Sequence, residues 1–208
     1  MLLPGLSHAK ESALRAKCKS NIRQIGIAMR MYADENNDKV PTVPGVSNWP
    51  WDLPTTVVTN LERQGMQRHV LYCPSAALQD NDVLWTDWAK KNNYYVTGYC
   101  YWTTNVGGVD PKFMVSRFTT AYTNVSQAVL ISDATVSTGV TLKNGVFNGG
   151  GNFTRIIGGW DKPHRTSHLS GQLPAGGNSL YLDNHVDWTP FKKMTIRTFS
   201  GFSPQFWW

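Results

Sequence analysis

Apolar residues at helical spacing mark the first 33 positions of the chain. They recur at steps of three or four residues, and lysine and arginine occupy many of the positions between them. Such spacing places the apolar side chains along one face of an α-helix. No proline interrupts the pattern between Pro4 and Pro41, and Ser7 is a candidate N-cap. The sequence therefore predicts a long helix over residues 1–33, with a core stripe of Leu14, Cys18, Ile22, Ile25, Met29 and Tyr32.

The remaining residues, 34–208, carry shorter patterns that are typical of one globular domain of the α+β class. Aromatic and β-branched residues cluster in two segments, which favours strands there, whereas glycines cluster in a third segment. The expected elements are helices over 55–64 and 81–91, strands over 94–105 and 126–134, and an irregular loop over 145–170.

A hairpin is the clearest pattern near the C-terminus. Asp183 and Asn184 separate two alternating segments and can supply the two left-handed residues of a type I′ turn. We therefore expect the long helix to pack on an antiparallel sheet of about four strands, joined by irregular loops. An apolar tail follows, which either folds back onto the domain or forms an assembly contact. Its aromatic residues are Phe199, Phe202, Phe206, Trp207 and Trp208.

The formal net charge of +6 is concentrated in the predicted helix. Between His8 and Arg30 there are six lysines or arginines and a single acidic residue, Glu11. This stretch indicates either a solvated helix face or a surface for phospholipid or an acidic neighbour. The rest of the chain is close to neutral and shows no nucleic-acid motif, so no nucleic-acid partner is expected.

The three cysteines, Cys18, Cys73 and Cys100, form no Cys-x-x-Cys pair, which argues against a zinc cluster of the usual spacing. Two alternatives stay open. One is a disulfide with one free thiol, with Cys18 and Cys73 as the first choice because Cys73 falls in a predicted loop that could cover the helix. The other is three buried free thiols.

Several segments resemble one family of bacterial proteins. The helical region contributes residues 1–6, 9–11, 18–26 and 31–36, and later segments contribute 40–41, 73–75, 168, 176–178 and 180–186. Together they resemble type IV prepilin-like proteins related to type II secretion pseudopilin G, a family abundant in planctomycetes, Verrucomicrobia and Lentisphaerae. The C-terminal segments resemble its processing-associated motif, a histidine followed at a distance by Asp-Gly.

Two departures from the family pattern stand out. The usual Phe-Thr-Leu-x-Glu-Leu start and the apolar membrane segment are missing, so Met1 corresponds to an internal family residue and Pro4 to the place where pilins commonly kink their helix. The usual Asp-Gly is Asp183-Asn184, and His168 lies farther from Asp183 than the motif implies.

The resemblance implies a pilin-like fold and a structural, non-catalytic role. By that likeness the chain is the soluble part of a pseudopilin or minor pilin-like subunit of a type II secretion or type IV pilus-like assembly. Its implied partners are other pilin-like subunits, the secretion machinery and, through an N-terminal apolar helix, the inner membrane. The implied location is the cell envelope, with the domain in the periplasm or in a surface filament.

Two other function classes have residues in their favour, although no cofactor is expected. A secreted glycan-binding module would use Trp49, Trp51, Trp85, Trp88 or Trp102 as stacking platforms. A metal-dependent enzyme would bind zinc, or calcium, through aspartate and histidine side chains, which otherwise cap turns and pin loops. The candidate ligands are Asp133, Asp161, His164, His168, Asp183 and His185.

Overall fold

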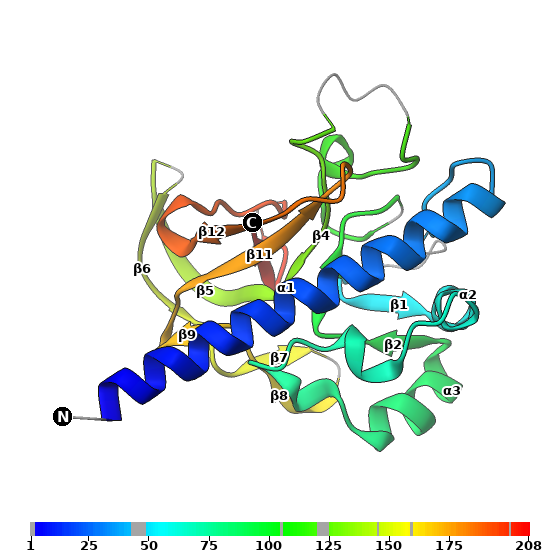
Figure 1. Ribbon diagram of the computed structural model, residues 1–208. Coiled ribbons are helices and arrows are strands. Elements are labelled where there is room, and N and C mark those ends of the chain that lie inside the picture. Colours follow the sequence, from blue (N-terminus) through cyan, green and yellow to red (C-terminus); the bar gives the residue numbers. More distant parts are fainter. Residues whose placement is uncertain are drawn as a thin grey trace.

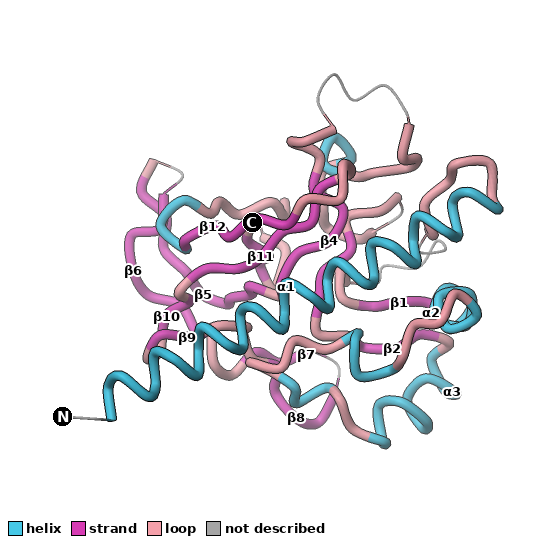
Figure 2. Tube along the Cα trace, in the orientation of Figure 1, coloured by secondary structure: helices cyan, strands magenta, loops and turns pink. Residues whose placement is uncertain are grey.

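A single long helix, α1 (Leu3–Glu35), runs along one side of the molecule in the computed structural model (Figure 1). The structure describes residues 3–42, 49–104, 106–119, 125–144, 146–158, 160–199 and 201–208. The first turns of α1 extend beyond the other elements, whereas its later turns lie over the sheets (Figures 1 and 2). The predicted helix is confirmed, but Ser7 lies inside it and is not its N-cap. Pro4 stands in the first turn, where the missing N–H breaks no helical hydrogen bond.

The apolar stripe of α1 forms much of the main core. Cys18, Ile22, Ile25 and Met29 are buried, as their helical spacing predicts. Leu14 and Tyr32, at the two ends of the stripe, are only half-buried.

A four-stranded antiparallel sheet lies beneath α1, in the order β12, β11, β4, β3. Alternate residues of β3 enter two different hydrophobic clusters, because neighbouring side chains of a strand point to opposite faces. Tyr99 and Tyr101 join the cluster that contains the α1 stripe, while Cys100 and Trp102 belong to the cluster behind the sheet. The strands are β3 (Tyr99–Tyr101), β4 (Val129–Asp133), β11 (Gly176–Tyr181) and β12 (Val186–Pro190).

The expectation of a pilin-like fold with one sheet of about four strands is wrong. The broad α+β class holds, but the described residues form further antiparallel sheets: one of three strands, β13–β5–β6, and three of two strands, β1–β2, β7–β8 and β9–β10. The protein thus contains more β-structure than was predicted. The additional strands are β1 (Asp52–Pro54), β2 (Tyr94–Val96), β5 (Thr135–Lys143), β6 (Val146–Asn152), β7 (Ile156–Gly158), β8 (Trp160–His164), β9 (Leu169–Ser170), β10 (Leu173–Pro174) and β13 (Gln205–Trp207).

The glycine-rich region 145–170 explains most of the error, since it contains β6, β7, β8 and β9 and is not an irregular loop. In β6, Gly149, Gly150 and Gly151 all have positive φ, yet the strand pairs with β5 across an irregularity in register. Backbone pairing with the preceding strand β5, and not side-chain alternation, defines this strand.

Short helices connect the strands at one end of the molecule. The predicted helix over 55–64 is confirmed as α2, and that over 81–91 as a π-helical turn, η3, that continues into α3. Their bounds, with those of the other short turns, are α2 (Thr55–Arg63), η1 (Arg68–Leu71), η2 (Ala77–Gln79), η3 (Val83–Trp88), α3 (Ala89–Asn92), η4 (Pro111–Phe113) and η5 (Phe191–Lys193).

The β11–β12 hairpin is confirmed, but its predicted turn type is wrong. Of the two central residues only Asn184 has a positive φ, of 69°. The Asn184 N–H donates to the Tyr181 carbonyl at 2.9 Å, and the Tyr181 N–H donates to the His185 carbonyl at 3.0 Å. This is a three-residue loop that ends in a left-handed residue, which asparagine adopts readily.

The apolar tail folds back onto the domain. Strand β13 pairs with β5, which buries Phe206 and Trp207. Trp208 stacks on Trp102, with ring centroids 3.4 Å apart. Phe199, in contrast, remains exposed. The tail therefore completes the cluster behind the central sheet.

Candidate functional site

A disulfide between Cys18 and Cys73 ties α1 to the segment that follows η1. The two Cα atoms lie 5.3 Å apart, and 55 positions separate the residues in sequence. Cys100 is a buried free thiol in the second cluster. The structure thus forms the first of the two arrangements considered for the cysteines.

Asp133, the last residue of β4, lies beside this disulfide and is buried. Its Oδ2 accepts hydrogen bonds from the backbone N–H of Asn178, at 2.7 Å, and from Asn178 Nδ2, at 2.9 Å. Its Oδ1 lies 3.2 Å from Cys18 Sγ. Asn178 belongs to β11, so the pairing of β11 with β4 holds the carboxylate in place.

His168 occupies the loop before β9 and is fully buried, with a positive φ of 53°. Its Nε2 lies 3.3 Å from Asp133 Oδ2 and 3.4 Å from Cys73 Sγ. Its Nδ1 lies 2.8 Å from Glu11 Oε1. Its backbone N–H donates to Ser75 Oγ at 2.9 Å. The imidazole therefore lies between two carboxylates and against the disulfide.

The electrostatics of His168 follow from these neighbours. Burial alone lowers the pKa of an imidazole, but the hydrogen bond and negative charge of Asp133, followed by those of Glu11, outweigh it. The pKa of His168 is therefore raised above its usual value.

Glu11 connects this buried group to the surface of α1. Its carboxylate accepts a hydrogen bond from Arg15 Nε at 3.0 Å, and the Arg15 guanidinium lies over the Trp188 ring, 4.0 Å from its centroid. Trp188 also meets the His168 ring edge to face. The one acidic residue of the basic helical stretch therefore has a specific partner within the domain.

Four potential metal ligands converge here. One donor atom from each of Cys18, Cys73, Asp133 and His168 lies within 4.8 Å of the others, and all four residues are buried. While the disulfide is intact its sulfurs are neither thiolates nor nucleophiles. The buried imidazole and carboxylate do not contact solvent, so in this state the group is suited to holding elements together.

The predicted metal set is brought together only in part. Asp133 and His168 lie in contact, but His164 does not join them. Its Nδ1 lies 2.9 Å from Gln79 Nε2, and its ring stacks on Trp51. Two further candidates, Asp183 and His185, lie on the exposed hairpin, where His185 Nδ1 is 2.5 Å from Asp183 Oδ1. The Asp161 backbone belongs to β8, and its side chain lies outside the described part of the chain.

Two residues of the cluster, Glu11 and Asn178, were missed by the sequence reasoning. Glu11 is separated from His168 by 157 positions, and Asn178 reaches Asp133 only through strand pairing. The signal available was the isolated negative charge of Glu11 in a basic helix. The sequence also offered no reason to place the cysteines beside a histidine, whereas in the structure Cys73 contacts His168.

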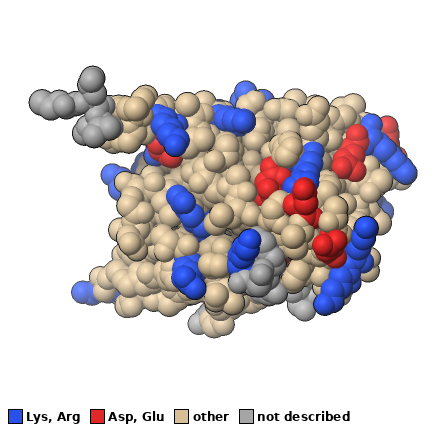
Figure 3. Space-filling model, turned by 90° about the horizontal axis from the view of Figure 1, so that it is seen from below, with Lys and Arg blue, Asp and Glu red and all other residues tan. Residues whose placement is uncertain are grey.

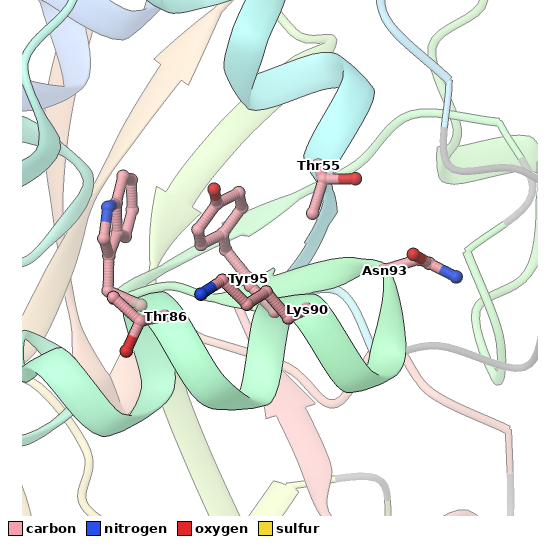
Figure 4. Close-up of a pocket in the computed structure, with 7 residues that line it drawn as sticks. Thr55, Thr86, Lys90, Asn93 and Tyr95 are labelled. Atoms are coloured by element: carbon pink, nitrogen blue, oxygen red, sulfur yellow. The ribbon is translucent and has the colours of Figure 1, made fainter.

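None of the five candidate stacking tryptophans, Trp49, Trp51, Trp85, Trp88 and Trp102, is fully exposed. Trp51 and Trp102 are buried in the second cluster and cannot serve as stacking platforms on the surface. Trp85 is half-buried and packs against Tyr95, with ring centroids 4.1 Å apart. This pair lines a shallow pocket together with Thr55 and Lys90 (Figure 4).

Comparison with known proteins identifies no relative: the sequence matches no protein-family model, no curated protein and no solved structure. Within the described residues, no helix is both long enough and apolar enough to cross a bilayer.

Proposed function

We propose that this protein is a non-catalytic, pseudopilin or minor pilin-like subunit of a type II secretion or type IV pilus-like envelope assembly. The observation that carries the proposal is the exposed first part of α1. Residues 5–10 are all exposed, and the side chain of Leu6 is 68% exposed. This rests on the helix and on the sequence resemblance, and it does not require a four-stranded pilin sheet.

The exposed turns receive little support from the domain, because the first fully buried residue of α1 is Cys18. A helical segment as short as these exposed turns is marginal in water by itself, because most helices in proteins are stabilised by packing. Contact with neighbouring subunits, or continuation into an apolar membrane helix, would supply that packing. Both are parts of the proposal.

Two further features support the proposal, one concerning the location of the protein and one concerning its partners. A buried structural disulfide is typical of oxidising compartments and rare in the cytosol. The basic side chains give no continuous patch on the face in Figure 3, where they are separated by neutral surface or interspersed with acidic groups. This distribution favours protein or lipid partners over nucleic acid.

In vivo photo-crosslinking tests the proposed assembly contact. A photoreactive amino acid replaces Leu6 in the cells that make the protein, and the matched control replaces Leu78, an apolar residue in η2 that is 53% exposed. We expect Leu6 to capture a pilin-like subunit or a second copy, and Leu78 not to. Equal capture at the two positions would refute the proposal.

The gene itself offers an independent test. We expect the codons upstream of Met1 to encode a short basic leader, a prepilin-type junction and about 20 apolar residues. A stop codon or a cleavable secretory signal at that place would contradict the proposed anchor.

The pocket beside Trp85 favours one alternative, a glycan-binding module. That function predicts a change of tryptophan fluorescence with a soluble polysaccharide, lost in Trp85→Ala and retained in Trp88→Ala. Trp88 is the appropriate control, because it is also half-buried but packs against Tyr94 and does not line the pocket. An absence of any fluorescence change would remove this alternative.

A further inference from the structure

We propose that reduction of the Cys18–Cys73 disulfide converts the buried cluster into a zinc site. In that state Cys18, Cys73, Asp133 and His168 together bind one Zn²⁺. This set keeps Asp133 and His168 from the ligands suggested by the sequence and adds the two cysteines. It draws its ligands from α1, the segment after η1, β4 and the loop before β9.

The donor set has the composition of a zinc site. Two thiolates, one imidazole and one carboxylate make four ligands, the number that tetrahedral Zn²⁺ takes in closed structural sites. Softer thiolate ligands favour zinc over magnesium or calcium, which prefer oxygen. All four residues are buried, which excludes water from competing for the metal.

The spacing of the donors matches tetrahedral coordination. With Zn–S bonds of about 2.3 Å and Zn–N or Zn–O bonds of about 2.0 Å, sulfur and a nitrogen or oxygen ligand lie about 3.5 Å apart. The observed separations are 3.2 Å for Cys18 Sγ to Asp133 Oδ1 and 3.4 Å for Cys73 Sγ to His168 Nε2. His168 Nε2 lies 3.3 Å from the other carboxylate oxygen, Asp133 Oδ2, so the imidazole and the carboxylate are also adjacent. Once their bond is broken, the two sulfurs must separate to about 3.8 Å, and all the donor atoms already lie within 4.8 Å of one another.

The hydrogen bonds that orient zinc ligands from behind are already present in the structure. A zinc-bound histidine usually donates its other N–H to a carboxylate, and His168 Nδ1 lies 2.8 Å from Glu11 Oε1. Asn178 donates two hydrogen bonds to Asp133 Oδ2, which orients the carboxylate and leaves Oδ1 to face Cys18. Tyr99 Oη lies 3.4 Å from Cys18 Sγ and can donate to a thiolate.

The conversion balances with a dithiol as the reductant and Zn²⁺ as the incoming ion. A dithiol reductant gives two electrons and two protons to the disulfide and becomes a cyclic disulfide, which leaves two thiols in the protein. Zn²⁺ then displaces both thiol protons, and one more from His168 if the imidazole is protonated. Glu11, with a partly exposed side chain, marks the side from which the ion can enter.

Cobalt substitution provides the direct test. The chain is reduced with a phosphine, stripped of metal with a chelator and titrated anaerobically with Co²⁺, then Zn²⁺. We expect one Co²⁺ per chain, with the visible absorption of a tetrahedral site and a thiolate charge-transfer band, displaced by one equivalent of Zn²⁺. The oxidised chain is the matched control, since its Cys18 and Cys73 sulfurs are held in the disulfide and cannot act as thiolate ligands. Absence of binding by the reduced chain, or equal binding by the oxidised chain, would overturn the proposal.

Variants assign the ligands. Cys18→Ser and Asp133→Asn are expected to abolish the tetrahedral spectrum, whereas Cys100→Ala, which alters the buried cysteine outside the cluster, keeps it. Glu11→Gln is expected to weaken zinc binding about 10- to 100-fold, and Glu62→Gln, on an exposed part of α2, to leave it unchanged. Equal zinc affinity in Glu11→Gln and the unaltered chain would contradict the outer role of Glu11. Since the wild-type titration does not depend on any variant folding, it decides the proposal alone.

Discussion

Asp52, in β1, has a carboxyl group that folding removes almost completely from water. Its Oδ2 accepts a hydrogen bond from the Trp49 N–H at 3.0 Å, and its Oδ1 has no hydrogen-bond partner among the described residues. Burial raises the pKa of Asp52 to about 8, and the single hydrogen bond lowers it only in part. The nearby groups Tyr94 and Cys100 also have raised pKa values, in each case mainly through burial.

The sign of the resulting pH dependence is fixed. Between the ordinary aspartate pKa of 3.8 and the folded value of about 8, the folded chain keeps a proton on Asp52 that the unfolded chain has lost. The contribution of Asp52 to stability is therefore fully present below pH 3.8. It declines as the pH rises and is lost near pH 8, by up to about 1.4 kcal/mol per pH unit.

Asp52→Asn should remove this decline. The amide has nearly the same size and can still accept the hydrogen bond from Trp49, but it does not ionise. We expect the variant to melt at a higher temperature than the unaltered chain at pH 8, with a smaller difference at pH 4.5. Thermal unfolding across this range measures the effect, and the exposed Asp87→Asn is the control. Parallel pH profiles for Asp52→Asn and the unaltered chain would show that Asp52 is ionised in the folded state.

Gly98 packs closely against the segment that carries the disulfide. A Cβ atom at this position would lie 2.6 Å from the Cys73 backbone nitrogen and 3.0 Å from Tyr72 Cα. Backbone atoms cannot move aside cheaply, so we expect Gly98→Ala to destabilise the fold by about 1–3 kcal/mol in denaturant unfolding. Gly5→Ala, whose Cβ would have no neighbour within 4 Å, should not be destabilising. Equal stability of the two variants would mean that the segments can separate.

At the scale of elements, α1 presents two isoleucines in contrasting positions. Ile25 is fully buried, and Ile27, two positions later, is 47% exposed. Ile25→Asp places a charge in the main core and should cost about 4 kcal/mol or more, whereas Ile27→Asp should change stability by about 0.5 kcal/mol or less. Denaturant unfolding of the two variants separates packing from helix propensity. An unchanged unfolding midpoint for Ile25→Asp would show that the stripe does not carry the packing.

The elements also differ in how far their sequence predicted them. The α1 stripe was predicted because helical hydrogen bonds are local and burial follows the 3.6-residue period. Strand β6 was not, since its three consecutive glycines carry no side-chain alternation and are typical of a loop. Within the candidate site, Asp133 and His168 were named, but the contact of His168 with Glu11 depends on the position of α1 across the whole domain.

For the whole molecule, the Cys18–Cys73 bond closes a loop across a sequence separation of 55. In the chain-entropy description such a loop stabilises the fold by about 4 kcal/mol. We expect the reduced, metal-free chain to melt roughly 10 °C lower than the oxidised chain. Calorimetry with and without reductant, in the presence of a chelator, measures this difference. The same comparison in Cys18→Ser should show no effect of reductant, and a persistent effect there would assign it to another group.

The position of this bond along α1 also determines how the protein carries a mechanical load. A pull on the exposed turns of α1 first meets the contact of Glu11 with His168, and it then reaches the disulfide at Cys18 before the packed residues Ile22 and Ile25. If only apolar packing held α1, its contacts with the domain would break one residue after another from the N-terminal end. With the disulfide formed, the force passes instead through a covalent link to Cys73. The contacts of α1 with the sheet beyond Cys18 then do not have to carry the load.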